Sequence, residues 1–169
     1  MGLKCNVDMN AMRKRFENFY RVVEEKQIKR LQILGEEAVK LARNEHPNNW
    51  QDQTGNLRSS IGYMVFKDGE PVVESVFEQI AIEHQEGVNY DGAQRGMQFC
   101  KTIGEKTHGI ALVVVAGMNY AQHVEAGHAT KDGHVVAGRD VLTTAEQFVE
   151  RALPRMLEEL KSNIIKAAE

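Results

Sequence analysis

The densest group of side chains able to do chemistry in this sequence follows an apolar run that ends at a glycine. The stretch VVVAGMNYAQHVEAGH and the residues after it contain a tyrosine, three histidines and a glutamate. Imidazole nitrogens and carboxylate oxygens are common zinc ligands in proteins. The group formed by His123, Glu125, His128 and His134 therefore raises the hypothesis of a metal-dependent hydrolase.

The spacing of these residues favours a solvated helix face over a metal site. If residues 120–126 form a short helix between Asn119 and Gly127, then His123 and Glu125 point to nearly opposite sides. The sequence lacks the zinc-protease pattern, a nucleophile elbow, a phosphate-binding loop and a dinucleotide fingerprint. We therefore expect no enzyme activity, no catalytic residue, no metal and no cofactor, and the metal-dependent hydrolase is kept as an alternative.

Glu125 has a position that requires an electrostatic partner. A glutamate in the last turn of a helix faces the negative end of the helix dipole, which costs a few tenths to about 1 kcal/mol unless a cation compensates. Arg58 is a candidate partner at the expected start of the first strand, because its planar guanidinium suits a carboxylate. The alternative is that Arg58 and Glu125 are two unrelated surface charges.

A long helix over residues 10–45 is predicted ahead of these residues. Apolar residues recur there in steps of three and four, which is typical of an amphipathic helix. Some 35 residues of helix extend about 50 Å, whereas a compact domain of this length is about 40 Å across. We expect part of the helix to overhang, ending at HPNNW; a break at Gly35 into two helices is the alternative.

The sheet region is predicted over residues 54–142. After a turn at Thr54-Gly55-Asn56, a hairpin of strands 59–66 and 72–77 joined at Asp68-Gly69 is indicated by β-forming residues around a turn signal.

The rest of that region contains one strong strand signal and two loops. Residues 110–116 are seven consecutive apolar residues between glycines, which indicates a strand covered on both faces; we interpret it as the central strand. The glycine-rich region 87–108 is expected to be loops around one short helix. Residues 128–139 are expected to form an exposed loop or small hairpin.

A helix over residues 143–169 closes the chain. Thr143 and Glu146 have the spacing of a capping box, and Pro154 predicts a kink or short break. Together the elements predict a single α+β domain, 1–169, with a long N-terminal helix, a small mostly antiparallel sheet, a short helix after the central strand, and a kinked C-terminal helix.

Composition restricts the class of function. The net charge is −3, which argues against a protein that mainly binds nucleic-acid phosphates. No apolar run approaches the roughly 20 residues of a membrane span, so we expect no membrane partner. Cys5 and Cys100 lack metal-ligand spacing and indicate free thiols in a reducing, cytosolic compartment.

Two segments resemble the tail-completion or head–tail joining (neck) protein family of long-tailed bacteriophages. Members carry a G-x-L-R-x-S-I segment, a Y-A-x-x-V-E-x-G segment after a central strand, and a closing helix. The matching residues here are Gly55, Leu57, Arg58, Ser60, Ile61, Tyr120, Ala121, Val124, Glu125 and Gly127. After Gly127 the family usually has threonine and then a proline–phenylalanine pair, whereas His128 begins a longer loop in this chain.

The resemblance implies a non-enzymatic structural protein of a phage or prophage. Such proteins assemble as rings at the junction of capsid and tail, or cap the tail. The implied partners are copies of the chain itself and other neck and tail proteins, in the host bacterial cytoplasm during assembly and then in the virion neck or tail. The acidic balance suits a conduit that DNA must traverse without binding. A cytosolic adaptor that uses its long helices is a further alternative.

The stretch NYAQHVEAGH is therefore predicted to be a structural corner and not a reactive site. Tyr120 and Val124 are expected to pack inward, and Glu125 is expected to tie the end of the short helix to the sheet.

Overall fold

The computed structural model describes residues 8–43, 54–80 and 88–168 of the chain. The elements of the described residues are, in order, α1 (Met9–Arg43), α2 (Asn56–Ser60), β1 (Ile61–Lys67), β2 (Glu70–Glu74), α3 (Gly92–Gly104), β3 (Ile110–Ala116), α4 (Ala121–Ala126), β4 (Gly127–Ala129), β5 (Val135–Ala137) and α5 (Thr143–Ala168). They form the predicted α+β fold, with helices at both ends and a small antiparallel sheet between them.

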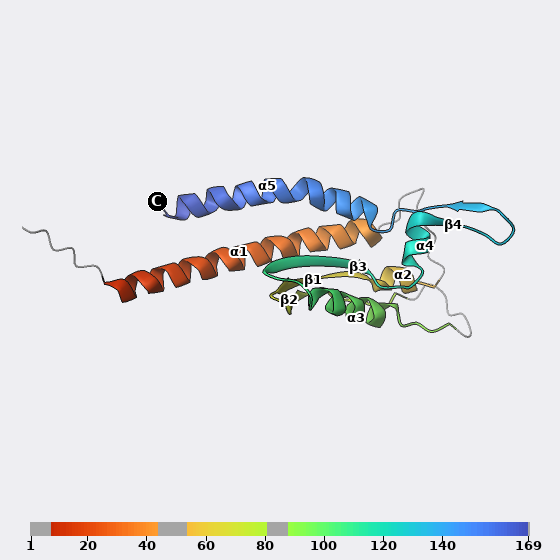
Figure 1. Ribbon diagram of the computed structural model, residues 1–169, viewed down its shortest axis with the longest axis horizontal. Helices are drawn as coiled ribbons and strands as arrows, with labels where there is room; N and C mark the ends of the chain where they lie inside the picture. The colour runs from red at the N-terminus through yellow and green to blue at the C-terminus, as the bar shows by residue number, and fades with distance from the viewer. Residues whose placement is uncertain (1–7, 44–53, 81–87, 169) are drawn as a thin grey trace, which may run out of the picture.

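The elements stack in layers (Figure 1). α1 covers one face of the three-stranded sheet, α3 covers the other face, and α5 packs on α1 and runs back along it. Side chains alternate along β1: Ile61, Tyr63 and Val65 pack toward α1, whereas Met64 and Phe66 pack toward α3. The alternation of a strand therefore builds two cores, one on each face of the sheet.

The central strand of the sheet is β1, and the prediction that residues 110–116 form the central strand is wrong. The strand order is β2-β1-β3, and both pairings are antiparallel. β3 is apolar throughout because α1 lies on one of its faces and α3 on the other. A strand covered on two faces can still lie at the edge of its sheet, since coverage and strand pairing are independent.

α1 is one continuous helix, as predicted, and it is not interrupted at Gly35. The ring of Tyr63 packs so closely against the helix at Gly35 that a Cβ at this position would collide with it. The glycine therefore serves close packing of the sheet on the helix. The buried residues of α1 all lie in its second half, and residues 8–22 are exposed. Figure 1 shows this first part of α1 extending beyond the sheet, which confirms the predicted overhang.

The predicted hairpin is present, but the bounds of both its strands need correction, since the second strand, predicted at 72–77, is β2 at Glu70–Glu74. β1 and β2 turn at Asp68 and Gly69 as predicted, but Ser59 and Ser60 belong to helix α2 and not to the first strand. α2 forms because the hydroxyls of both serines bond to backbone carbonyls within the same turn, a local bond that competes with strand pairing. The predicted helix end at residues 46–50 lies outside the described residues.

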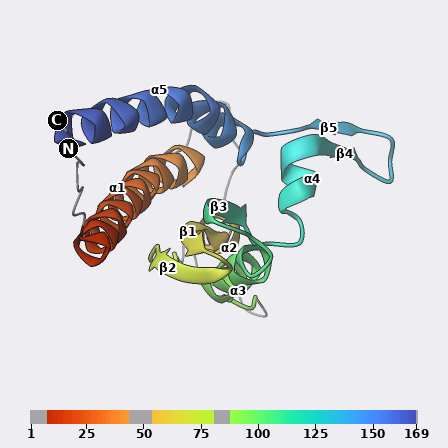
Figure 2. The same ribbon diagram turned by 60° about the vertical axis from the view of Figure 1, so that its left-hand side comes forward.

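In the second half of the chain, the helix within 87–108 and the hairpin within 128–139 are present as predicted, whereas the short break predicted at Pro154 does not occur. The glycine-rich region holds the helix α3, and residues 128–139 lie in a small hairpin made by β4 and β5. Figure 2 shows this hairpin projecting away from the layers. α5 continues through Pro154 without a break, and Figure 1 shows it curving over α1.

Candidate functional site

The carboxylate of Glu125 joins the end of α4 to the start of α5. Its Oε2 accepts hydrogen bonds from the backbone N–H groups of Val141 and Leu142, at 2.7 and 2.8 Å. Its Oε1 accepts one from the Thr143 N–H, at 3.1 Å, and one from the Thr143 hydroxyl. The first N–H groups of a helix have no partner within the helix. Glu125 therefore caps α5 from a distant position in the chain.

This arrangement corrects two sequence expectations. The side-chain oxygen of Thr143 bonds to Glu125, and the Glu146 N–H donates to the Leu142 carbonyl, so Glu125 replaces the predicted capping box. The described donors to the Glu125 carboxylate belong to the start of α5, and the predicted contact with Arg58 is not among them. The unfavourable end of the α4 dipole is offset instead by the positive end of α5, so Glu125 ties α4 to a helix and not to the sheet.

The pKa of Glu125 reflects these bonds. Partial burial raises the pKa of this carboxyl group, because burial disfavours its charged form. The hydrogen bonds from Thr143, Leu142 and Val141 favour the charged form and outweigh burial, so that the pKa lies below its usual value. Glu125 is therefore ionised near neutral pH and holds a negative charge at the N-terminus of α5.

The other residues of the second resemblance segment are structural. Tyr120 and Val124 pack against the core between α1 and the sheet, as predicted, and Ala121 is buried in that core. Gly127 follows the last residue of α4 and pairs with Ala137 in the β4–β5 hairpin. The segment is a corner through which the chain passes from β3 to the hairpin.

The first resemblance segment forms a tight contact between α2 and α3. Leu57, Ser60 and Ile61 are buried, and Gly55 precedes α2, where its carbonyl accepts from the Ser59 hydroxyl. Arg58 is half-buried in α2. Every residue of this segment that matches the family pattern thus lies in the short helix α2 or next to one of its ends.

Close approach of α2 to α3 depends on glycine at Gly96. A Cβ at Gly96 would collide with the carbonyl of Ser60, the last residue of α2. The Gly117 N–H then donates to the same Ser60 carbonyl, at 3.1 Å. This bond fastens the first resemblance segment to Gly117, which lies three residues before the second segment.

Several residues of this contact were not singled out from the sequence. The Arg43 guanidinium donates twice to the Ile61 carbonyl, at 3.1 and 2.6 Å, and fastens the end of α1 to the start of β1. The side chain of Asn56 donates to the Asn89 carbonyl and accepts from Gln79. The sequence signal at this contact is the run of small polar residues in TGNLRSS. Such a run indicates a turn, but it does not show which distant residues bond to it.

The histidine group does not converge on one point. The rings of His123 and His128 meet edge to face with centroids 6.4 Å apart. Among the described residues, no group of three or more His, Cys, Asp and Glu side chains is placed to hold a metal ion. The Glu125 carboxylate points to α5. Cys100 is buried in the core, where burial raises the pKa of its thiol to about 12; Cys5 lies outside the described residues.

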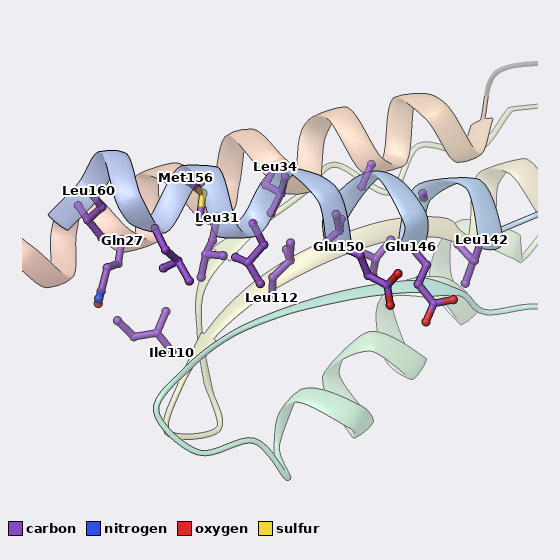
Figure 3. A pocket seen from close by; sticks show the side chains of 16 residues that line it. Gln27, Leu31, Leu34, Ile110, Leu112, Leu142, Glu146, Glu150, Met156 and Leu160 are labelled. Atoms are coloured by element: carbon purple, nitrogen blue, oxygen red, sulfur yellow. The ribbon is translucent and has the colours of Figure 1, made fainter. Parts of the chain in front are cut away.

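A groove with a volume of about 920 Å³ lies between α1, α5 and β3. Its walls are mostly apolar side chains, which Figure 3 shows converging from the three elements. Among the residues that line it are the apolar Leu31, Leu112, Val114 and Val149 and the acidic Glu146 and Glu150. We call this feature the α5 groove.

Two acidic side chains border the α5 groove. Glu146 and Glu150 are one turn apart on α5 and hang from it toward β3 (Figure 3). Both are exposed, and neither forms an ion pair with any other described residue. The groove therefore combines an apolar interior with negative charge at one margin.

Comparisons with family models, with curated proteins and with solved structures find no match to this chain. Within the residues that the structure describes, no helix has the length and apolar character needed to cross a membrane.

Proposed function

We propose that the protein is a non-enzymatic assembly protein of a phage or prophage, which joins head to tail or completes the tail as a homo-oligomeric ring. The observation that carries the proposal is the exposed first part of α1, residues 9–22. This stretch, which we call the N-terminal arm, leaves large apolar side chains in solvent, among them Phe16 and Tyr20. Exposed apolar surface of this kind is typical of a protein that binds another protein.

The two resemblance segments support the same proposal. They are the basis of the resemblance to neck proteins, and their residues build the corner and the α2–α3 contact. The most prominent ionisable side chain in them, Glu125, is engaged in capping a helix. Their chemistry is therefore that of a scaffold, which is what an assembly protein requires.

Deletion of the gene tests the proposal. We expect the deletion phage to produce filled or leaking heads and separate tails, with few joined particles, by electron microscopy and particle counts. Complementation with the gene on a plasmid should restore joined particles. Normal numbers of infectious virions from the deletion, or a gene locus without structural phage genes, would contradict the proposal.

A helical adaptor is a second candidate, because the exposed apolar arm would suit a helical partner of another kind. The two candidates differ in their partner. An adaptor would bind a cellular protein through the arm and leave virion assembly unchanged, whereas a neck protein would copurify with phage particles.

A further inference from the structure

We propose that the N-terminal arm of one copy of the chain docks in the α5 groove of a second copy. The inference deepens the proposed function and rests on its self-assembly part, for which it supplies the contact. It is carried by two surfaces of the same chain that lack a partner among the described residues and that match each other in shape, polarity and charge.

The arm presents a continuous apolar stripe. Met12, Phe16 and Tyr20 recur every four residues and are 41%, 55% and 68% exposed. Residues at this spacing lie on one side of a helix, so the three side chains form a row. Most helical stability in proteins comes from packing of an apolar face, so burial of this stripe against a partner would stabilise the arm.

Positive charge flanks the stripe. Arg13 and Arg15 lie on either side of the row that contains Met12 and Phe16, by the 100° rotation per residue of a helix. Neither arginine forms an ion pair with another described residue. Over residues 9–22 the arm carries four basic residues, Arg13, Lys14, Arg15 and Arg21, against one acidic residue, Glu17, so the net charge of the arm is positive.

The α5 groove offers the complementary surface. Leu31, Leu112, Val114 and Val149 supply apolar walls from α1, β3 and α5. Glu146 and Glu150 supply the negative margin that the arginines of the arm need. The arm is about 20 Å long, and the stretch of α5 along the groove, from Ala145 to Leu160, extends about 22 Å. An amphipathic helix lying in an apolar groove is a recurring mode of recognition.

An N-terminal arm that occupies the groove must come from another copy of the chain. α1 is one continuous helix whose second half forms a wall of the groove. Its first part extends away from that wall in Figure 1, so the arm cannot fold back into its own groove. The contact joins two different patches, and such head-to-tail contacts generate rings when the rotation closes.

Paired variants of the full-length chain test the docking. Phe16→Asp disables the arm, and the double charge reversal Glu146→Lys with Glu150→Lys disables the groove. All three positions are exposed, so circular dichroism and thermal melting should show folded subunits. Wild type should self-associate in sedimentation velocity, and each variant alone should associate at least about tenfold more weakly, since a charge replaces an apolar contact or attraction becomes repulsion.

Mixing the two variants is the decisive step. The arm variant retains an intact groove and the groove variant retains an intact arm, so the mixture should form a one-to-one complex. A control variant in the hairpin, Val135→Asp, should associate like wild type. A wild-type chain that stays monomeric at the highest attainable concentration, variants that associate like wild type, or a mixture that forms no complex would each overturn the docking.

Failure of the docking is distinguishable from failure of the proposed function. The docking is decided by purified chains, whereas the function is decided by the particles of the deletion phage. Unjoined heads and tails in the deletion, together with monomeric wild type, would support a neck protein that uses another contact.

Discussion

At the scale of single residues, Glu125 connects two helices through one side chain. Its carboxylate accepts four hydrogen bonds from three consecutive residues at the start of α5. Hydrogen bonds to a charged group are stronger than those between neutral groups. Loss of the carboxylate would leave the N–H groups of Val141, Leu142 and Thr143 without these bonds at a half-buried position, which lowers the stability of the fold. Glu125 therefore has a defined energetic role in holding the corner against α5.

Replacing Glu125 should produce a pH-dependent loss of stability. At pH 7, Glu125→Gln should lower the free energy of unfolding by about 1–2 kcal/mol, on the scale of a lost helix cap. The folded pKa of Glu125 is lower than its unfolded value near 4.5. Its contribution is thus complete above the unfolded pKa and is lost as the pH falls through the folded pKa. The stability gap between wild type and Glu125→Gln should narrow below about pH 4.5.

Urea unfolding at a series of pH values measures this gap. Glu158→Gln is the matched control, because Glu158 is an exposed glutamate on α5; it should change stability by less than about 0.5 kcal/mol at every pH. A gap between Glu125→Gln and wild type that stays constant from neutral to acid pH would contradict the capping role.

At the scale of elements, the packing of β1 on α1 depends on a glycine in the middle of a helix. Gly35 allows the ring of Tyr63 to lie against the helix backbone. The Tyr63 hydroxyl reaches the Glu36 carboxylate, at 3.3 Å. Burial, the charge of Glu36 and this hydrogen bond raise the pKa of Tyr63 to about 12. Tyr63 thus holds β1 against α1 in two ways, by packing of its ring on Gly35 and by the hydrogen bond from its hydroxyl to Glu36.

Substitution of Gly35 by alanine should destabilise the protein. Alanine favours helix by about 1 kcal/mol relative to glycine, but here its Cβ would collide with the Tyr63 ring. Overpacking in a core costs about 1–3 kcal/mol, so we expect Gly35→Ala to lower the melting temperature. Glu37→Ala, at an exposed position in the same turn, is the control and should change it little.

A double-mutant cycle separates the collision from other effects. Gly35→Ala should cost less in a Tyr63→Ala background, because the ring that it meets has been removed. Thermal unfolding measures the loss of stability caused by Gly35→Ala in each background. An equal loss in the two backgrounds would show that the Tyr63 ring is not the reason why position 35 requires glycine.

At the scale of the whole molecule, the chain is elongated. The N-terminal arm lies at one end and the β4–β5 hairpin projects near the other (Figures 1 and 2). The arm has a net positive charge and the α5 groove has two glutamates at one margin, although the chain as a whole carries a net charge of −3. The separation of unlike surfaces is the property that a head-to-tail assembly requires.

Self-association through these surfaces should weaken with salt and then level off. Added salt screens the attraction between the arginines of the arm and the glutamates of the groove. Burial of the apolar stripe does not depend on this attraction, so a residual association should persist at high salt. Sedimentation equilibrium across a sodium chloride series measures both effects. Association that is independent of salt would show that the acidic margin plays no part.

The local patterns of the sequence determined the type and position of the long elements, whereas the short helix α2 was not predicted. The steps of three and four in α1, the turn at Asp68-Gly69 and the apolar run of β3 are signals carried by neighbouring residues, and each element lies where its signal predicts. The inward packing of Tyr120 and Val124 follows from the same kind of local signal, since the spacing of residues along a helix sets its apolar face.

Only the tertiary structure decided which distant groups meet. The partner of Glu125 is the start of α5 and not Arg58, and the central strand is β1 and not β3. Both outcomes depend on the placement of whole elements in space, and that placement is set by the summed packing of many side chains. Spacing along the chain fixes the face of a helix or strand, but it does not specify which other element will cover that face.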